Sequence, residues 1–513
     1  MDDLLRDTAA RATRYLDGLA ARGVAPAPAA VERLRELGGP LPDGPTDPAA
    51  VVALLDEIAA PATVVNAGGR YFGFVNGGSL PAALAANWLA GAWDQNAGPS
   101  PASPMGAALE EISIRWILDA LGLPATAGGG LVTGATMANF AGLAAARHAL
   151  LQRQGWDVEQ DGMFGAPPLT VVVGNEVHVS VLKALSLLGL GRERVVRVPT
   201  DAQGRLRADR LPALSSTTIV CIQAGNVNTG ALDPAQAVCA RARDAGSWVH
   251  VDGAFGLWAA AAPGRRHLAA GLELADSWAT DCHKWLNVPY DCGVVLVANP
   301  RDLEAAMSAS AATYLAQGAE RHPFRYTPEM SRRARGVEVW AALRSLGRAG
   351  LAELIERTCR HATRFADGLR AAGYAVLNDV VLNQVLVSFG DAETTNRVIA
   401  AIQEDGTCWC GGTVWQGRAA MRISVSSWAT TAEDVDASLA AMLRAARRIA
   451  APTVSRQPED ARDGLSRARR LPIPSNRATL TPGRFPDTRA EPQPAPAVAG
   501  LAPGDPSPTR RST

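Results

Sequence analysis

Lysine is almost absent from this chain of 513 residues, which contains only Lys183 and Lys284. Arginine accounts for the other 48 of its 50 basic residues. A guanidinium group stays charged at physiological pH, so arginine cannot act as a nucleophilic amine. A lysine amine can do so once burial or a neighbouring charge lowers its pKa. Each lysine is therefore a candidate for amine chemistry, although most lysines in proteins are solvated surface residues.

Other absences exclude several classes of protein. No apolar run is long enough to span a bilayer, and acidic and basic residues balance at 50 each, so nothing favours a membrane or nucleic acid as partner. The seven cysteines include no C-x-x-C pair and do not resemble a disulfide framework. The amino terminus is charged and amphipathic, unlike a secretory signal. We expect a cytoplasmic protein with free thiols that acts on a small molecule.

Composition divides the chain into parts. Residues 451–513 contain 12 prolines and one aromatic residue, too little apolar surface to offset the entropy of ordering, so we predict a disordered tail rich in proline and arginine. Residues 1–60 predict an N-terminal helical segment, interrupted by a Pro/Gly break at 37–48. Between these ends we expect a large domain over 61–330 and a smaller α/β domain over 331–450.

Apolar strand-like runs alternate with helical patterns in the large domain. Strands are predicted at 170–174, 218–223, 248–253, 276–280 and 292–298. Helices are predicted at 136–150, 179–189 and 233–245. This alternation predicts a parallel sheet covered by helices, in which ligands bind at the carboxyl ends of the strands.

Asp252 ends the strongly apolar run VHVD. A carboxylate at that position is costly to bury unless it has a positive or protonated partner. A helix cap, or an ion pair with Arg265 or Arg266, would explain it equally well. Asp252 is therefore a candidate functional carboxylate with a structural alternative.

A glycine-rich turn at 128–134, in GGGLVTGATMANF, leads into a helix that begins near Ala135 or Thr136. Backbone N–H groups at a helix start, together with a threonine hydroxyl, can hold a phosphate. The segment matches neither common nucleotide-binding glycine motif. Many glycine-rich turns only cap a helix, so this signal is weak by itself.

Two further candidates lie near strand ends. His178 follows the strand at 170–174 at the start of a helix, where a capping or core role is the common alternative. Lys183 lies inside that amphipathic helix, where a solvated role suffices. Lys284 follows a different strand and is flanked by Asp281 and His283.

Together these features fit pyridoxal phosphate (PLP). A lysine binds its aldehyde, an N–H cradle holds its phosphate, and a buried carboxylate keeps its pyridine nitrogen protonated, so that the ring accepts electrons. A histidine could stack on the exposed face of the ring. No metal is predicted, because Cys408 and Cys410 have no nearby partners that would complete a site.

The motifs that carry this chemistry resemble the group II PLP-dependent amino acid decarboxylases, the family of aromatic amino acid, histidine, tyrosine and glutamate decarboxylases. The resemblance covers about residues 45–445. Its most specific motifs are HVDGAFG (250–256) and ADSWATDCHKWLNVPYDCG (275–293). It implies an α/β aminotransferase-like type I fold, with a large, mainly parallel PLP-binding domain and a smaller C-terminal domain. It also implies a homodimer with active sites at the subunit interface, and decarboxylation of an L-amino acid to the amine and CO2.

The resemblance assigns cofactor roles to particular residues. It makes Lys284 the Schiff-base lysine and Asp252 the partner of the pyridine nitrogen, with Ala254 against the ring and His178 stacked on it. The resemblance also implies three phosphate contacts and two further cofactor contacts. These are Ala135, Thr136 and His283 for the phosphate, with Asp281 and Asn226 as the further contacts.

On the substrate side, the resemblance implies that Tyr314, about thirty residues past Lys284, returns a proton to the α-carbon. A tyrosine in such a Gly/Ala-rich loop could also be incidental. Tyr71 and Phe72 are expected to contact substrate. Arg422 resembles an arginine that meets a substrate carboxylate in glutamate decarboxylase, although an ion pair at the sheet edge is an equal alternative.

Two rival functions stay open at this point. An aminotransferase or a carbon–carbon lyase would use the same cofactor and fold for a different reaction. A non-catalytic, PLP-binding or scaffolding protein would act through the arginine-bearing tail.

Overall fold

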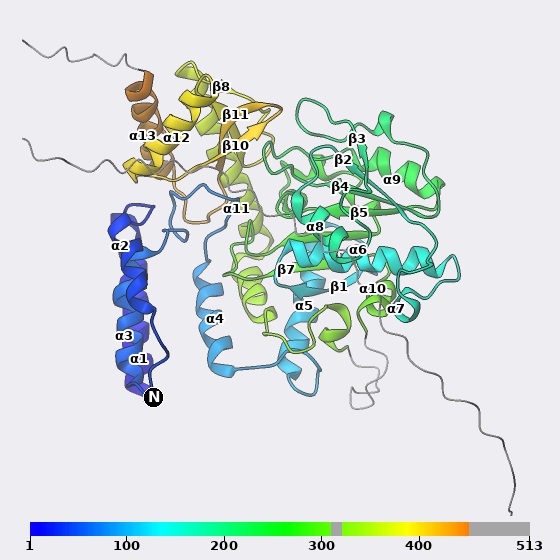
Figure 1. Cartoon of the computed structure of the whole chain (residues 1–513), viewed down its shortest axis with the longest axis horizontal. Helices are drawn as coiled ribbons and strands as arrows, with labels where there is room; N and C mark the ends of the chain where they lie inside the picture. Colours follow the sequence, from blue (N-terminus) through cyan, green and yellow to red (C-terminus); the bar gives the residue numbers. More distant parts are fainter. Residues whose placement is uncertain (309–320, 451–513) are drawn as a thin grey trace, which may run out of the picture. The chain divides into compact units, whose positions relative to one another are not determined.

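The computed structural model describes residues 1–308 and 321–450, which fall within one compact unit, Met1–Pro452. Tyr314 and the segment 451–513 lie outside the described residues. Two β-sheets organise this unit, one of seven strands and one of four (Figure 1).

The seven-stranded sheet carries the centre of the fold. Its strands are β1 (Gly128–Val132), β2 (Thr170–Gly174), β3 (Val196–Val198), β4 (Thr218–Gln223), β5 (Trp248–Asp252), β6 (Ser277–Asp281) and β7 (Gly293–Val297). They lie in the order β1-β7-β6-β5-β4-β2-β3. Strand β7 runs antiparallel to both of its neighbours, and the other pairs are parallel. The expected parallel sheet is thus mainly parallel, with one reversed strand.

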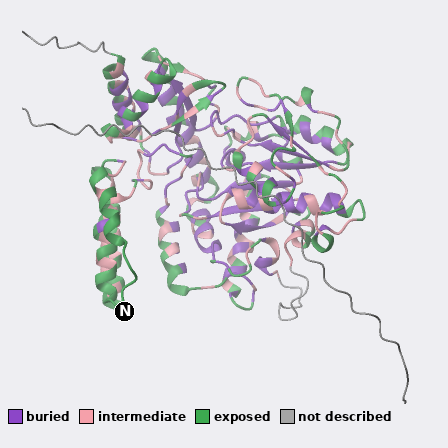
Figure 2. Ribbon diagram, in the orientation of Figure 1, coloured by how far each residue is buried: buried purple, intermediate pink, exposed green. Residues whose placement is uncertain are grey.

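Helices cover both faces of this sheet, because alternate side chains of its Val- and Ile-rich strands point to opposite sides. On one face, α6 (Ala135–Gln152), α8 (Val179–Leu187) and α10 (Pro300–Met307) pack against side chains such as Val171 and Val173. On the other face, α5 (Pro104–Leu121), α9 (Ala235–Asp244) and the first part of α11 (Gly336–Ala371) pack against Val172 and Val220. The buried strands are purple in Figure 2.

The predicted elements agree closely with these bounds, with two exceptions. The strands 170–174 and 218–223 are confirmed. The strand predicted at 248–253 ends one residue earlier, and those predicted at 276–280 and 292–298 differ by one residue at each end. Strand β3 was not predicted, and β1 was wrongly assigned to a glycine-rich turn. Glycine is a poor strand former, but here it is required for close packing, because a Cβ on Gly129 would lie 1.8 Å from the carbonyl oxygen of Val295 in β7.

The smaller, antiparallel sheet has the order β10-β11-β9-β8. Its strands are β8 (Ala375–Val376), β9 (Gln384–Ser388), β10 (Gly411–Trp415) and β11 (Arg418–Ser424), packed with α12 (Ala392–Asp405) and α13 (Ala432–Ala450). Helix α11 kinks at Gly347, whose φ of 57° breaks the helical backbone, and then continues to this second sheet.

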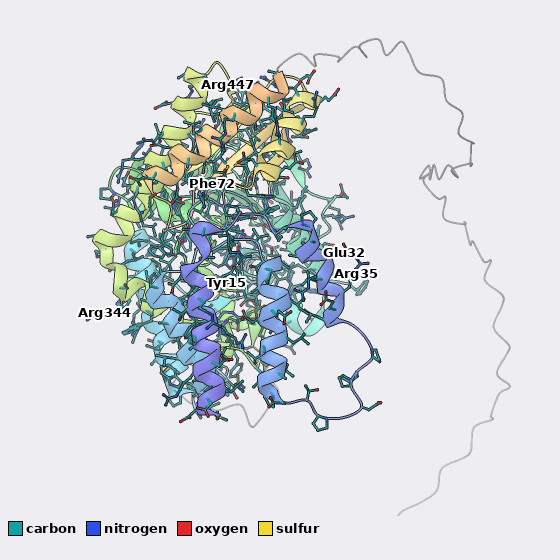
Figure 3. All side chains as sticks on the ribbon, turned by 90° about the vertical axis from the view of Figure 1, so that its left-hand side faces the viewer. Tyr15, Glu32, Arg35, Phe72, Arg344 and Arg447 are labelled. Carbon is teal, nitrogen blue, oxygen red and sulfur yellow. The ribbon has the colours of Figure 1, made fainter. Side chains whose placement is uncertain are left out.

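The N-terminal helices are α1 (Asp2–Asp17), α2 (Pro28–Arg33), α3 (Pro48–Ala59) and α4 (Pro81–Trp93), with the short α7 (Val158–Asp161) farther along the chain. Helices α1 and α3 lie side by side, joined by the ion pair of Arg11 with Asp56 (Figure 3, where Tyr15 marks α1). Both are largely exposed (green in Figure 2). Among the described residues, no helix combines the length and apolar character needed to cross a membrane.

A buried ion cluster fastens the segment before α11 to the large sheet. The carboxylate of Glu110 in α5 lies 2.8 Å from Nη2 of Arg332 and 3.3 Å from Nη2 of Arg321. Arg332 also donates a hydrogen bond to the carbonyl oxygen of Leu131 in β1. The side chains of Glu110 and Arg332 are 1% and 0% exposed, so neither charge can be solvated if its partner is removed.

We therefore expect Glu110→Gln to lower the free energy of unfolding by about 3–5 kcal/mol, as is typical when one member of a buried ion pair is lost. The neighbouring Glu111 pairs with Arg115 at the surface, where the side chains are 43% and 64% exposed, and is the matched control. Glu111→Gln should cost less than about 1 kcal/mol. Urea unfolding followed by circular dichroism measures both, and equal losses would contradict this account of the cluster.

Candidate active site

Residues from the ends of strands and from the starts of α6 and α8 meet in a cavity of about 370 Å³. It lies at the carboxyl ends of β5 and β6, the edge at which parallel α/β sheets bind ligands. Seven of the predicted cofactor residues line it: Ala135, Thr136, His178, Ala254, Asp281, His283 and Lys284. The structure thus brings together positions that are up to 149 residues apart in the sequence.

Lys284 lies in the turn that follows β6, with its amine facing a carboxylate. Its Nζ is 2.9 Å from Oδ2 of Asp281, and its side chain is 18% exposed. The rival Lys183 is exposed on α8 and does not line the cavity. The chain before α4 packs directly on the Lys284 turn, where a Cβ on Gly77 would lie 1.9 Å from the carbonyl oxygen of Lys284. The geometry therefore favours Lys284 as the amine of the site.

Asp281, the last residue of β6, connects this amine to the start of α6. Its Oδ1 accepts a hydrogen bond from the backbone N–H of Ala135 at 2.5 Å. His283 lies with Nε2 3.5 Å from the same oxygen, and its Nδ1 accepts a hydrogen bond from the N–H of Cys292. Burial lowers the pKa of His283. The helix start thus combines backbone donors with a carboxylate, an imidazole and the lysine amine.

Space at the helix start depends on glycine. A Cβ on Gly134, the residue before α6, would lie 3.1 Å from Cε1 of His283, and one on Gly293 in β7 would lie 2.6 Å from the backbone of Gly134. Any larger residue would push β7 or His283 away from the helix start. The absence of side chains here leaves the first turn of α6 open to an anion.

Asp252 is buried at the end of β5 without a cationic side chain. The residue is 4% exposed, and among the described residues its carboxylate forms one side-chain hydrogen bond, from the N–H of Ala254 at 3.3 Å. The alternative ion pairs do not form: Arg265 lies 3.4 Å from Glu356, and Arg266 donates to the carbonyl oxygen of Ala260. A buried carboxylate in this state calls for a positive or protonated partner.

His178 caps the start of α8 and faces the charges of the site. Its Nδ1 accepts a hydrogen bond from the N–H of Ser180. Burial lowers the pKa of His178, and the nearby charges of Asp252, Lys284 and Arg422 partly oppose one another. His178 therefore caps α8, as the structural alternative expected, and it also lines the cavity.

Some predicted residues are not brought to the cavity. The Oδ1 atom of Asn226 accepts hydrogen bonds from the N–H groups of Asn228 and Thr229, so this side chain holds its own turn. The ring of Phe72 is fully buried in the core of the small sheet and contacts Phe365 at 5.1 Å (Figure 3 labels Phe72). Tyr71 is 6% exposed and stacks on Trp409 at 5.2 Å. The substrate contacts expected for Tyr71 and Phe72 have no support in this placement.

Arg422 lies in β11, close enough for its charge to affect His178. Its Nη1 donates to the carbonyl oxygen of Val227 at 3.2 Å and approaches Oδ1 of Asn228 at 3.5 Å. No carboxylate in residues 1–308 or 321–450 lies within ion-pair distance of its guanidinium, so the alternative of an ion pair at the sheet edge is not observed there. Burial lowers the pKa of Arg422.

Sequence reasoning missed Tyr290, which also lines the cavity. Its ring stacks on His283 at 4.3 Å, and its hydroxyl donates to Oδ1 of Asn76 at 2.7 Å. The segment VPYDC carries no pattern that distinguishes this tyrosine from a loop residue. Only the return of the chain from Lys284 to β7 places it against His283.

Three groups of this site fit the chemical groups of PLP. An accessible lysine amine and an open helix start border one cavity. The buried Asp252, which has no cationic partner among the described residues, does not line the cavity itself, but it accepts a hydrogen bond from Ala254 in the cavity wall. These three groups match the pyridine nitrogen, the aldehyde and the phosphate of PLP.

Comparison with known proteins gives a consistent result. A family described as "Pyridoxal-dependent decarboxylase conserved domain" matches residues 56–390. Tryptophan decarboxylase 1 of Oryza sativa subsp. japonica is 28% identical over 398 residues, 70% of this chain and 76% of that protein. L-2,4-diaminobutyrate decarboxylase of Rhizobium meliloti is 29% identical over 391 residues, 72% and 76% of the two chains. The crystal structure of Oryza sativa TDC with PLP and tryptamine has a TM-score of 0.81 at 24% identity, covering 87% of this chain and 98% of that one.

Proposed function

The chain belongs to the pyridoxal-dependent decarboxylase family, and from this premise we propose how its own residues serve the reaction. It is a PLP-dependent enzyme that decarboxylates an amino acid. When bound, PLP accepts the electron pair left on the α-carbon as CO2 departs. The proposal rests above all on Asp252, a buried carboxylate that has no cationic side chain as partner in the described part of the chain.

Asp252 holds a proton on the pyridine nitrogen in this proposal, and Lys284 binds the cofactor aldehyde covalently. Since Lys284 already faces Asp281 at 2.9 Å, that carboxylate can hold the amine as a cation whenever it is released from the cofactor. Ala254, which donates its N–H to Asp252, lies against the ring. These three contacts fix the ring relative to the end of β5.

The phosphate is assigned to the first turn of α6, beside Ala135, with Thr136 and His283 as its donors. Backbone N–H groups and the helix dipole favour an anion at this end. Asp281 carries a negative charge at the same turn and accepts the N–H of Ala135. The N–H of Thr136, its hydroxyl and the imidazole of His283 are therefore the donors that we assign to the phosphate.

The substrate side of the site involves His178, Arg422 and Tyr314. His178 lies on the exposed face of the ring in this proposal, and Arg422 contacts a substrate carboxylate. Tyr314 falls outside the described residues. Its spacing from Lys284, in the motif AATYLAQG, supports it as the group that returns a proton to the α-carbon of an L-amino acid.

A homodimer with active sites at the subunit interface is also part of the proposal. Helices α1, α3 and α4 border an apolar cavity of about 850 Å³. Nearby on α4, Trp88, Leu89 and Trp93 are 44–51% exposed. A second copy of the chain would cover these apolar side chains. Analytical ultracentrifugation would show a single monomeric species if this part is wrong.

A cytoplasmic location is proposed as well. All seven cysteines are free and buried, a state that suits a reducing compartment.

Lys284 provides the most direct chemical test. Borohydride reduction of the holoenzyme, followed by peptide mapping, should place the pyridoxyl group on Lys284. Lys284→Arg should lower the rate of CO2 release by about a thousandfold or more, because arginine cannot form the covalent link. Lys183→Arg is the matched control and should keep both adduct and activity. An adduct on Lys183 would overturn the assignment.

The substrate is found by incubating the purified enzyme with individual amino acids and measuring CO2. Production of the amine with CO2 is expected for one of them. A keto acid with pyridoxamine phosphate as the main product would instead indicate transamination.

Arg422→Met tests the carboxylate contact on the substrate so identified. Loss of a charge-assisted hydrogen bond, worth about 1.5–3 kcal/mol, should raise KM about 10- to 100-fold. Arg418→Met is the matched control, since Arg418 is exposed at the start of the same strand. Steady-state kinetics of CO2 release measures both variants. An unchanged KM in Arg422→Met would remove Arg422 from the substrate site.

A further inference from the structure

A row of polar side chains leads from His178 into the interior, between the large sheet and α6. Ser180 in α8 is 7% exposed, and Asn139 in α6, His250 in β5 and Ser277 in β6 are each 0% exposed. Consecutive members are joined by hydrogen bonds of 2.7 Å (His178 to Ser180), 3.3 Å (Ser180 to Asn139), 2.9 Å (Asn139 to His250) and 2.8 Å (His250 to Ser277). We call Ser180, Asn139, His250 and Ser277 the relay.

The fold makes room for the relay at the expense of a side chain on α6. A Cβ on Gly142 would lie 2.8 Å from Cε1 of His250, so only glycine leaves space for that ring. Polar groups buried so deeply are costly unless every hydrogen bond is formed. The relay satisfies them one after another, and its outer member, Ser180, is hydrogen-bonded to His178 in the cavity wall.

The direction of the bonds at the inner end follows from Asn139. Its Nδ2 donates to Ser180, so its Oδ1 faces Nε2 of His250, which must carry a proton to form that bond. Burial lowers the pKa of His250 to about 3, so its ring is neutral and Nδ1 accepts from the hydroxyl of Ser277. The indole N–H of Trp248 also donates to Oγ of Ser277 at 2.9 Å.

The direction at the outer end is fixed in the same way. The amide Nδ2 of Asn139 donates to Oγ of Ser180, whose hydroxyl hydrogen is directed to Nδ1 of His178. The backbone N–H of Ser180 also donates to Nδ1 of His178 at 3.3 Å, and this group cannot reverse. Two donors therefore converge on Nδ1 of His178, which must be unprotonated.

We propose that the relay fixes His178 as the neutral tautomer protonated at Nε2, and that its four members are positioning residues for His178. The inference rests on the proposed function for the place of His178 beside the reacting groups. With Nδ1 occupied, Nε2–H is the donor that remains for an oxygen atom of cofactor or substrate. A ring held in one tautomer does not need to exchange its proton before it can donate.

The charges around His178 act on this state from several elements. Asp252 in β5 and Asp281 in β6 favour a protonated ring, whereas Lys284 and Arg422 oppose it, and burial, the largest influence, also opposes it. The relay contributes no charge. Together with the backbone N–H of Ser180, it selects between the two neutral tautomers.

The tautomer is measured directly by NMR of the purified protein without cofactor, labelled with ¹⁵N-histidine. The chain has seven histidines, few enough for each to be assigned, and His178→Phe identifies the signal of His178 by its loss. Long-range ¹H–¹⁵N correlations at neutral pH should give His178 the pattern of a neutral ring protonated at Nε2. A ring protonated at Nδ1, or an equal mixture, would overturn the proposal.

Asn139→Leu tests whether the relay is the cause. It removes the donor to Ser180, whose hydroxyl oxygen can then accept from Nδ1–H of His178. Only the longer bond from the backbone N–H of Ser180, at 3.3 Å, then still opposes a proton on Nδ1, so the second tautomer should become detectable. The matched control is Asn383→Leu, because Asn383 is also 0% exposed and donates to Val425 and Ser426 near the small sheet. The control should leave the His178 signal unchanged. A single tautomer in Asn139→Leu, or an equal change in the control, would overturn the role of the relay.

These results are distinguishable from a failure of the proposed function. If CO2 release is absent but His178 has the expected tautomer, the proposed reaction is wrong and the proposed role of the relay is supported. If CO2 release is normal but the tautomer differs, only the relay fails. The wild-type spectrum remains decisive if Asn139→Leu does not fold.

Discussion

The burial of the Asp252 carboxylate is the physical constraint on which the account of the site depends. A charge at the end of an apolar strand, 4% exposed and without a cationic side chain in the described residues, is unfavourable in the protein alone. The seven-stranded sheet holds it there because β5 is paired with β4 and β6 on either side. The proposed function explains this cost by a protonated nitrogen of the cofactor, which would be the positive partner of the carboxylate.

Close backbone packing then places the other groups around that carboxylate. Gly77 allows the chain before α4 to touch the Lys284 turn, and Gly293 allows β7 to touch the start of α6. Lys284 and the helix start are consequently held by main chain rather than by flexible side chains. A glycine is also required behind His178, because a side chain at Gly142 would collide with the ring of His250. Main-chain contacts thus fix where each chemical group of the cavity lies.

Much of this arrangement could be predicted from the sequence, because it depends on local patterns. Lys284 and Asp252 stand out since each follows or ends an apolar strand, and the ends of parallel strands meet at one edge. Phe72 and Asn226 were expected at the site because they belong to the right motifs. A motif does not specify which way a side chain points, and both side chains turn into the protein instead.

The remaining features depend on contacts between distant parts of the chain. Strand β1 was hidden by three consecutive glycines, whose poor strand propensity is overridden by pairing with β7. The relay joins Asn139 to His250 across 111 positions, and neither residue has a neighbour in sequence that suggests the other. Tyr290 reaches His283 only because the chain turns back into β7. No local pattern contains this information.

The protonation state of the cofactor nitrogen tests the central claim most directly. PLP labelled with ¹⁵N in its pyridine ring, bound to the enzyme, can be followed by NMR across neutral pH. The account predicts a protonated nitrogen in the wild-type enzyme and an unprotonated one in Asp252→Asn. Asp276→Asn, just before β6, is a control that should leave the nitrogen protonated. An unprotonated nitrogen in the wild-type enzyme, or no difference between wild type and Asp252→Asn, would contradict the account.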